Sequence, residues 1–134
     1  MKLSAVASRI VLATLFVFAG TLHFIIPDQY AAVMPPALPM HRALVFISGV
    51  AEIAGGIGLL VPRTRRAAGI GLILLLVAVW PANLQMLLNA RAAGASMLAQ
   101  TLFLLRLPLQ LVLIYWVWHA SRGGSASSRT PRSA

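Results

Sequence analysis

The sequence contains no cysteine and almost no acidic residues. Among its 134 residues there are 11 lysines and arginines but only two acids, Asp28 and Glu52. The absence of cysteine excludes disulfides, thiol redox chemistry and the thiolate ligands of an iron–sulfur cluster. Two acids also leave no visible nucleophile–base arrangement for hydrolysis. The sequence therefore favours a protein that is not an enzyme on its own and holds no Fe–S cofactor.

The chain also has few residues that could form a polar surface. Hydrophobic residues make up 60% of it and charged residues 10%, whereas a soluble domain this small needs much more polar surface. A membrane span takes about 20 apolar residues, so this length accommodates about four. The net charge of +9 would also suit a nucleic-acid binder, but the arginines punctuate apolar segments instead of forming one face. We predict an all-α polytopic membrane protein, a four-transmembrane-helix bundle, whose partner is the lipid bilayer and not nucleic acid.

Four apolar segments separated by polar or proline-rich stretches support this count. The first could instead be a signal peptide cleaved after Val17-Phe18-Ala19, but its apolar run continues beyond that site. Pro81 falls inside the third segment, where we expect a kink and not a break. The expected helices of a single transmembrane domain, residues 1–120, are 4–26, 43–61, 67–89 and 97–119, followed by a disordered basic cytoplasmic tail over 121–134.

The proline-rich connection between the first two spans, residues 27–42, has its own pattern. Its four prolines rule out a continuous helix. Residues 28–34 are free of proline and predict one short interfacial helix, with Tyr30 at headgroup depth. This connection is either a lid over the mouth of the bundle or a plain connector.

The basic residues are distributed unequally about the four expected spans. By the positive-inside rule, this bias places both termini in the cytoplasm. A three-span arrangement would instead place the basic tail outside. The cytoplasmic set comprises Lys2, Arg9, Arg63, Arg65, Arg66, Arg122, Arg129 and Arg132, against Arg42 and Arg91 on the other side.

Two opposite charges fall inside the spans at matching depth. Glu52 and Arg106 each lie about nine residues from the outer end of their segment, or roughly 13 Å at 1.5 Å per residue. Charged and polar side chains cannot face lipid cheaply, so they should point into the bundle. We predict a Glu52–Arg106 ion pair whose hydrogen bonds are completed by Asn83, Gln110 and His23.

This polar core has two interpretations. It is either a structural ion pair that fixes helix register or an outward-opening pocket for a small ligand. Trp80 is deep enough to line such a pocket, although packing alone would also explain it. The candidate ligand-binding or polar-core residues are His23, Glu52, Trp80, Asn83, Arg106 and Gln110. No catalytic residue and no metal ligand is predicted.

The histidines do not point to a metal or haem centre. His23 and His41 belong to the outer side, whereas His119 lies at the opposite membrane face. A bis-histidine haem site or a compact zinc site needs its ligands at one depth. We therefore expect neither haem nor zinc, and His23 alone is also typical of a helix-end histidine at the headgroup interface.

Several short motifs, in this order, resemble the DoxX-like family of small four-helix membrane proteins. They include Ala19–Pro27, Pro35–Pro39, Ser48–Leu60, Pro81–Asn83 and Arg106–Gln110. The resemblance covers about residues 10–119. It implies a four-helix bundle in a bacterial inner membrane and an association with membrane redox or oxidative-stress complexes, and it brings no catalytic role for any residue.

Three functions remain open on the sequence alone. The first is an accessory subunit of a quinone-linked redox or oxidative-stress system, with a quinone as candidate ligand and an oxidoreductase as candidate partner. The second is a carrier or binding protein for a small solute or lipid. The third is a structural or assembly protein in which the ion pair only locks the bundle. Assembly into a homo-oligomer is compatible with each of them.

Overall fold

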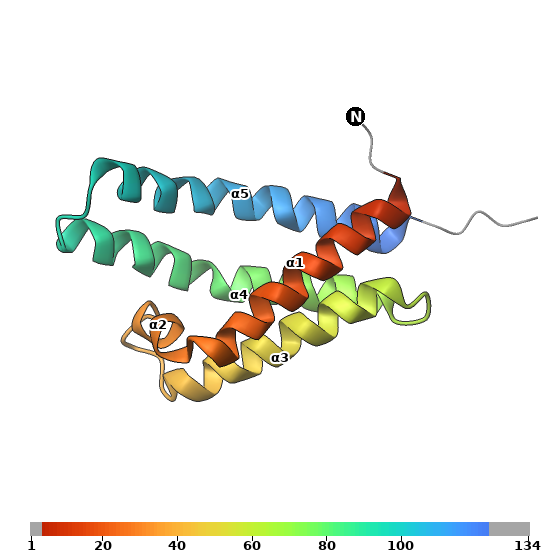
Figure 1. Cartoon of the computed structure of the whole chain (residues 1–134), viewed down its shortest axis with the longest axis horizontal. Coiled ribbons are helices and arrows are strands. Elements are labelled where there is room, and N and C mark those ends of the chain that lie inside the picture. Colours follow the sequence, from red (N-terminus) through yellow and green to blue (C-terminus); the bar gives the residue numbers. More distant parts are fainter. Residues whose placement is uncertain (1–3, 124–134) are drawn as a thin grey trace, which may run out of the picture.

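A computed structural model describes residues 4–123, and over this range the protein is all-helical. Four of its helices are long and apolar enough to cross a membrane, so the described chain is a multi-pass membrane protein. Helices α1 and α5 both begin at a serine whose hydroxyl accepts a backbone N–H of the first turn. The helices, which are labelled in Figure 1, are α1 Ala5–Ile25, α2 Pro27–Ala32, α3 His41–Leu60, α4 Arg65–Ala92 and α5 Met97–Arg122.

Two helices are longer than the sequence pattern predicts. The expected helix 67–89 extends from Arg65 to Ala92 and passes through Pro81 without a break. The expected helix 97–119 continues to Arg122, so the first two residues of the expected tail, 121–134, are helical. Residues 124–134 lie outside the described range. The predicted short helix is present as α2 and starts on Pro27, whose missing N–H costs nothing at that position.

The long helices form two antiparallel hairpins. Helix α1 packs along α3, with α2 between them in the chain, and α4 packs along α5 (Figure 1). The hairpins join where α3 packs against α4, while α1 meets α5 only near the ends of the chain. There the Nε of Arg9 donates to the carbonyl oxygen of Ala120 at 2.9 Å. The two hairpins therefore meet closely at one end of the bundle and diverge at the other.

Glycines set the close contact between α1 and α3. A Cβ on Gly20 would lie 2.7 Å from the carbonyl oxygen of Gly49, and one on Gly49 would lie 2.8 Å from Cβ of His23. Small residues of this kind let helix backbones approach closely in a membrane. Gly71 on α4 differs, because a Cβ added there would meet open space.

The end of the bundle where the hairpins meet contains the apolar core. We call this end the closed half and define it by its buried cluster. Helix–helix packing, with no water to exclude, must stabilise this part of a membrane protein. The cluster consists of Leu12, Phe16, Leu59, Leu72, Leu76, Val117 and Ala120.

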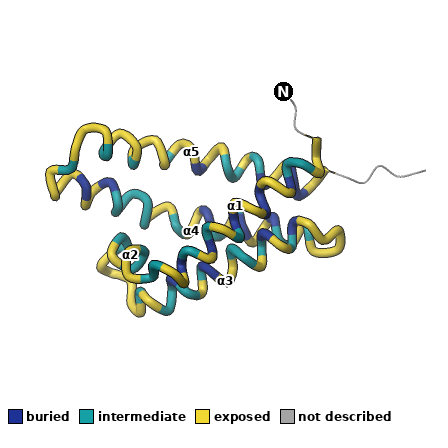
Figure 2. The backbone as a smooth tube through the Cα atoms, in the orientation of Figure 1, coloured by how far each residue is buried: buried dark blue, intermediate teal, exposed yellow. Residues whose placement is uncertain are grey.

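The other end, which we call the cavity half, contains the end of α1, α2, the start of α3, the end of α4 and the start of α5. Figure 2 shows buried backbone along α1, α3 and α4, whereas the first part of α5 is mainly exposed. No residue of α5 before Gln110 is buried. The start of α5 therefore covers little of the bundle interior.

Candidate functional site

A cavity of about 540 Å³ occupies the cavity half. Ligand cavities in proteins commonly measure about 300–1,000 Å³. Its walls come from all five helices and are mostly apolar, and Phe16 and Leu76 belong both to its lining and to the core cluster. The polar side chains that line it are His23, Tyr30, Ser48, Glu52, Asn83, Arg106 and Gln110.

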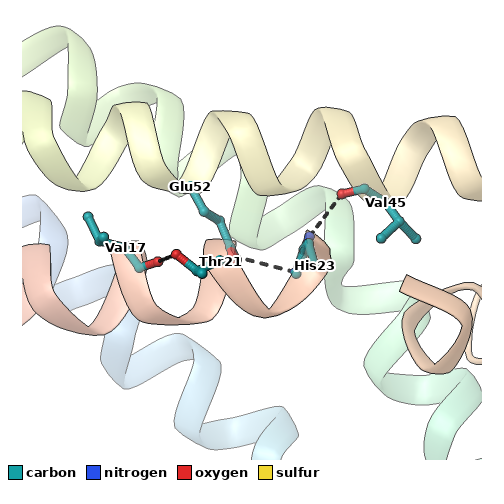
Figure 3. Close-up of polar contacts among 5 residues, drawn as sticks. All are labelled: Val17, Thr21, His23, Val45 and Glu52. Carbon is teal, nitrogen blue, oxygen red and sulfur yellow. Dashed lines mark hydrogen bonds and ion pairs between the residues drawn. The ribbon is translucent and has the colours of Figure 1, made fainter. Parts of the chain in front are cut away.

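His23 and Glu52 face each other across the α1–α3 contact. Nε2 of His23 lies 3.5 Å from Oε2 of Glu52, and Nδ1 lies 3.0 Å from the carbonyl oxygen of Val45 (Figure 3). His23 is 7% exposed, and Oε2 of Glu52 is buried without a hydrogen bond from any residue in 4–123. The Gly20–Gly49 contact brings the two helices close enough for this pair to form.

The predicted Glu52–Arg106 ion pair is wrong. Both residues line the cavity, but Glu52 pairs with His23, and Nη1 of Arg106 instead contacts Sδ of Met86 at 3.9 Å. The reason is helix adjacency: α3 packs against α1 and α4, and α5 packs mainly against α4. Glu52 and Arg106 lie at equal depth and therefore in one layer of the bundle, but α3 and α5 are not neighbouring helices.

Asn83 and Gln110 connect α4 to α5 in the same layer. Nδ2 of Asn83 donates to Oε1 of Gln110 at 2.8 Å. Nε2 of Gln110 donates in turn to the carbonyl oxygen of Leu76. Gln110 is 5% exposed, so this hydrogen-bonded pair satisfies polar groups that would otherwise be costly in a membrane interior. Each amide nitrogen has a second N–H that remains available to a ligand.

Trp80 does not belong to the site. Its side chain is 40% exposed and does not line the cavity. Its depth along the helix could be read from the sequence, but the direction of its side chain around the helix axis could not. The structure thus brings His23, Glu52, Asn83, Arg106 and Gln110 to one cavity and leaves Trp80 out.

Tyr30 lines the cavity and was not among the predicted site residues. Its ring lies 4.1 Å from the His23 ring, centroid to centroid. Burial and the negative charge of Glu52 raise the pKa of the Tyr30 hydroxyl above its ordinary value, while Arg106 opposes this shift. The hydroxyl therefore stays protonated near neutral pH and can donate a hydrogen bond. The proline-free stretch 28–34 predicted the helix that carries Tyr30, and a lid over the mouth of the bundle was one of the two interpretations of this connection. The pattern did not indicate that Tyr30 itself lines the cavity.

The cavity has a lateral opening, and a smaller hollow lies beside it. Leu15 and Phe18 on α1 and Leu109 on α5 line it and are 49%, 66% and 62% exposed, so it opens sideways between these helices. A smaller hollow of about 200 Å³ lies beside α2 and shares Tyr30 and Arg106 with the main cavity. The cavity therefore opens on the side of the bundle between α1 and α5, while the smaller hollow lies at the end of the bundle beside α2.

Helix α2 is tied to α3 by one exposed ion pair. Oδ1 of Asp28 lies 2.8 Å from Nη1 of Arg42. Asn89 of α4 also donates to the carbonyl oxygen of Ala32, at 3.5 Å.

Among residues 4–123, no three metal-ligating side chains lie close enough together to hold a metal ion.

The chain belongs to a family described as Domain of unknown function (DUF8561), whose family model matches residues 12–121. This match includes every residue of the cavity lining. No curated protein and no solved structure matches the chain. The resemblance to the DoxX-like family stays a prediction.

Proposed function

We propose that this protein binds a membrane-soluble quinone in its cavity and acts as an accessory subunit of a membrane redox or oxidative-stress system. The observation that carries the proposal is an apolar cavity, open sideways between α1 and α5, whose polar groups are concentrated in one layer. A quinone combines a polar ring with a long apolar tail. Such a ligand needs hydrogen-bond partners at one end and an apolar route out of the bundle at the other.

The charge of the site favours a neutral headgroup. One cation, Arg106, and one acid, Glu52, line the cavity. A phospholipid phosphate would normally be held by several cations, and the cavity lining offers one arginine. A ring with carbonyl acceptors carries no charge, so it can enter this layer without a counter-ion.

Hydrogen-bond donors are available to such carbonyls from both sides of the cavity. Tyr30 offers a hydroxyl from α2, Arg106 a guanidinium from α5, and Asn83 and Gln110 each an N–H beyond those already used. Tyr30 lies on α2, which packs against α1 and α3, whereas the other three donors lie on the hairpin of α4 and α5. A ring held between them would therefore connect the two hairpins where they diverge.

In this proposal the protein spans a bacterial inner membrane and has both termini in the cytoplasm. The basic residues support it, because Arg9 and Arg65 belong to the closed half, at the ends of α1 and α4 away from the cavity. The cavity would then lie toward the outer face. An oxidoreductase partner, or a second copy of this chain, would meet the bundle within the bilayer.

A carrier or binding protein for a small solute or lipid is the second candidate. The smaller hollow beside α2 favours it, because it adds a second polar surface next to the cavity, at the end of the bundle. Its lining includes Gln29 and Tyr30, which suit a polar solute.

Calorimetric titration of a short-chain naphthoquinone into the full-length protein in quinone-free nanodiscs tests the proposal. We expect binding above that of empty nanodiscs, and a roughly tenfold weaker affinity in Asn83→Leu, which loses about one hydrogen bond. Thr14→Val is the matched control, because Thr14 is exposed and bonds only to its own helix at Ile10. Saturable binding of a lipid or polar solute with no quinone binding would favour the carrier function instead.

A further inference from the structure

The proton positions of the His23 ring follow from its contacts. Nδ1 lies 3.0 Å from the carbonyl oxygen of Val45. A carbonyl oxygen can only accept a hydrogen bond, so Nδ1 carries a proton. In a neutral ring Nε2 is then a bare acceptor, and it is Nε2 that faces Oε2 of Glu52 at 3.5 Å.

If His23 is neutral and Glu52 is ionised, no proton lies between Nε2 and Oε2. Two lone pairs would then face each other, and Oε2 would be a buried charged oxygen without a donor. An uncompensated buried carboxylate is among the costliest groups in a protein interior. One added proton removes the conflict, either on Glu52, which then donates to Nε2, or on His23, which then donates to Oε2.

The other groups around the pair do not supply the missing charge. Tyr30 from α2 stacks at an angle on His23 and is neutral near pH 7. Arg106 from α5 lines the same cavity but forms no ion pair with Glu52. Helix α4 contributes Asn83, which does not titrate. Between about pH 5 and 9, the pair is therefore the part of the cavity lining that changes protonation.

We propose that His23 and Glu52 form a proton site that holds one exchangeable proton at neutral pH and presents it to the cavity. The contact of 3.5 Å between Nε2 and Oε2 is longer than an ordinary hydrogen bond, so the added proton can be shared with an acceptor atom of a ligand, such as a quinone carbonyl, in a three-centre hydrogen bond. Without the proton, the pair accepts a hydrogen bond from a donor such as a hydroquinone hydroxyl. The ligand identity rests on the proposed function, whereas the shared proton rests only on the contacts of the pair.

The proton itself can be observed without any ligand. The described chain has two acidic side chains, and Asp28 is exposed, so at pH 7 a protonated side-chain carboxyl belongs to Glu52. We expect either an infrared band of such a carboxyl, lost in Glu52→Gln and kept in Asp28→Asn, or a doubly protonated His23 ring by nitrogen-15 NMR, lost in His23→Asn. An ionised Glu52 beside a neutral His23 at pH 7 would overturn the proton site.

Binding should then depend on pH in opposite directions for the two redox forms of one ligand. Above the pH at which the pair loses its proton, quinone affinity is expected to fall to a level roughly tenfold weaker, because the pair no longer donates while the other donors of the cavity remain. Hydroquinone, titrated without oxygen, should not weaken in this way. Glu52→Gln keeps an N–H donor at every pH and should remove the trend for quinone.

The two proposals fail in different ways. Quinone binding that is the same at every pH from about 5 to 9 in the unmodified protein would overturn the proton coupling and leave the proposed function intact. Absence of binding at every pH, with the proton signal present, would overturn the quinone function and leave the proton site. Thr14→Val should follow the unmodified protein throughout, since Thr14 does not line the cavity.

Discussion

The two halves of the bundle are made from the same four long helices but are held together differently. In the closed half, Leu12, Leu59, Leu72 and Val117 are at most 1% exposed and form an apolar cluster, with the buried polar side chains of Arg9 and Ser121 at the same end of the bundle. In the cavity half the helices diverge, and polar side chains line a space of about 540 Å³. The closed half therefore provides most of the stability, and the cavity half can keep a partly open site.

The boundary between the halves is sharp. Phe16 and Leu76 contact the core on one side and the cavity on the other. The Gly20–Gly49 contact lies on the cavity side of this boundary and keeps α1 against α3 there, while nothing comparable holds α1 to α5. The cavity is therefore a consequence of where α1 and α5 cross.

Leu72→Ala should have the largest effect on the stability of the bundle. Leu72 is 1% exposed, and its side chain fills the space left by Gly55. We expect unfolding free energy to fall by about 2–5 kcal/mol, as for other buried large-to-small changes. Denaturation in mixed micelles, followed by circular dichroism, measures it. Leu102→Ala, at a 54% exposed position of α5, should change little, and equal losses in the two variants would contradict the division into halves.

Gly49→Ala should destabilise the protein less but should disturb the cavity more. The added Cβ would lie 2.8 Å from Cβ of His23, so α1 and α3 must separate where the His23–Glu52 pair forms. We expect a loss of about 1–3 kcal/mol. Gly71→Ala is the matched control, because its Cβ meets open space and the change improves helix propensity. An unchanged unfolding free energy in Gly49→Ala would show that the close approach of α1 and α3 is not required.

Asp28→Asn should have the smallest effect on stability. The Asp28–Arg42 pair is exposed, and such pairs contribute about 0–1 kcal/mol and weaken with salt. The same change should speed access to the cavity, because it releases α2 from the start of α3. Rapid-mixing measurements of ligand association at low and high salt test this, and an association rate that is unaffected by both the substitution and salt would mean that α2 is not a lid.

The fold could be predicted from the sequence because each apolar segment is long and clearly bounded. Prolines and arginines mark where the helices end, and the four long helices follow those marks. Errors arose at the helix ends, as at Arg65 and Arg122, where apolar patterning fades but backbone hydrogen bonds continue.

The site was predicted less well because depth is only one of the coordinates of a residue in a bundle. Depth placed Glu52, Asn83, Arg106 and Gln110 in one layer, and they do line one cavity. The partner of Glu52 also depends on which helices are neighbours and on which way each side chain points. That information comes from packing of α1 on α3, and it selected His23, a residue that could equally have been an interfacial histidine.

The contact between Arg9 and Ala120 has a consequence for the order of assembly. Arg9 is 7% exposed, and its Nε donates to a carbonyl oxygen 111 residues later in the chain. During synthesis, therefore, the first helix enters the bilayer with a guanidinium whose partner has not yet been made. Docking of α5 gives Nε of Arg9 its acceptor, so the crossing that shapes the cavity forms only after α5 has been made, and assembly intermediates without α5 should lack a site for the ligand.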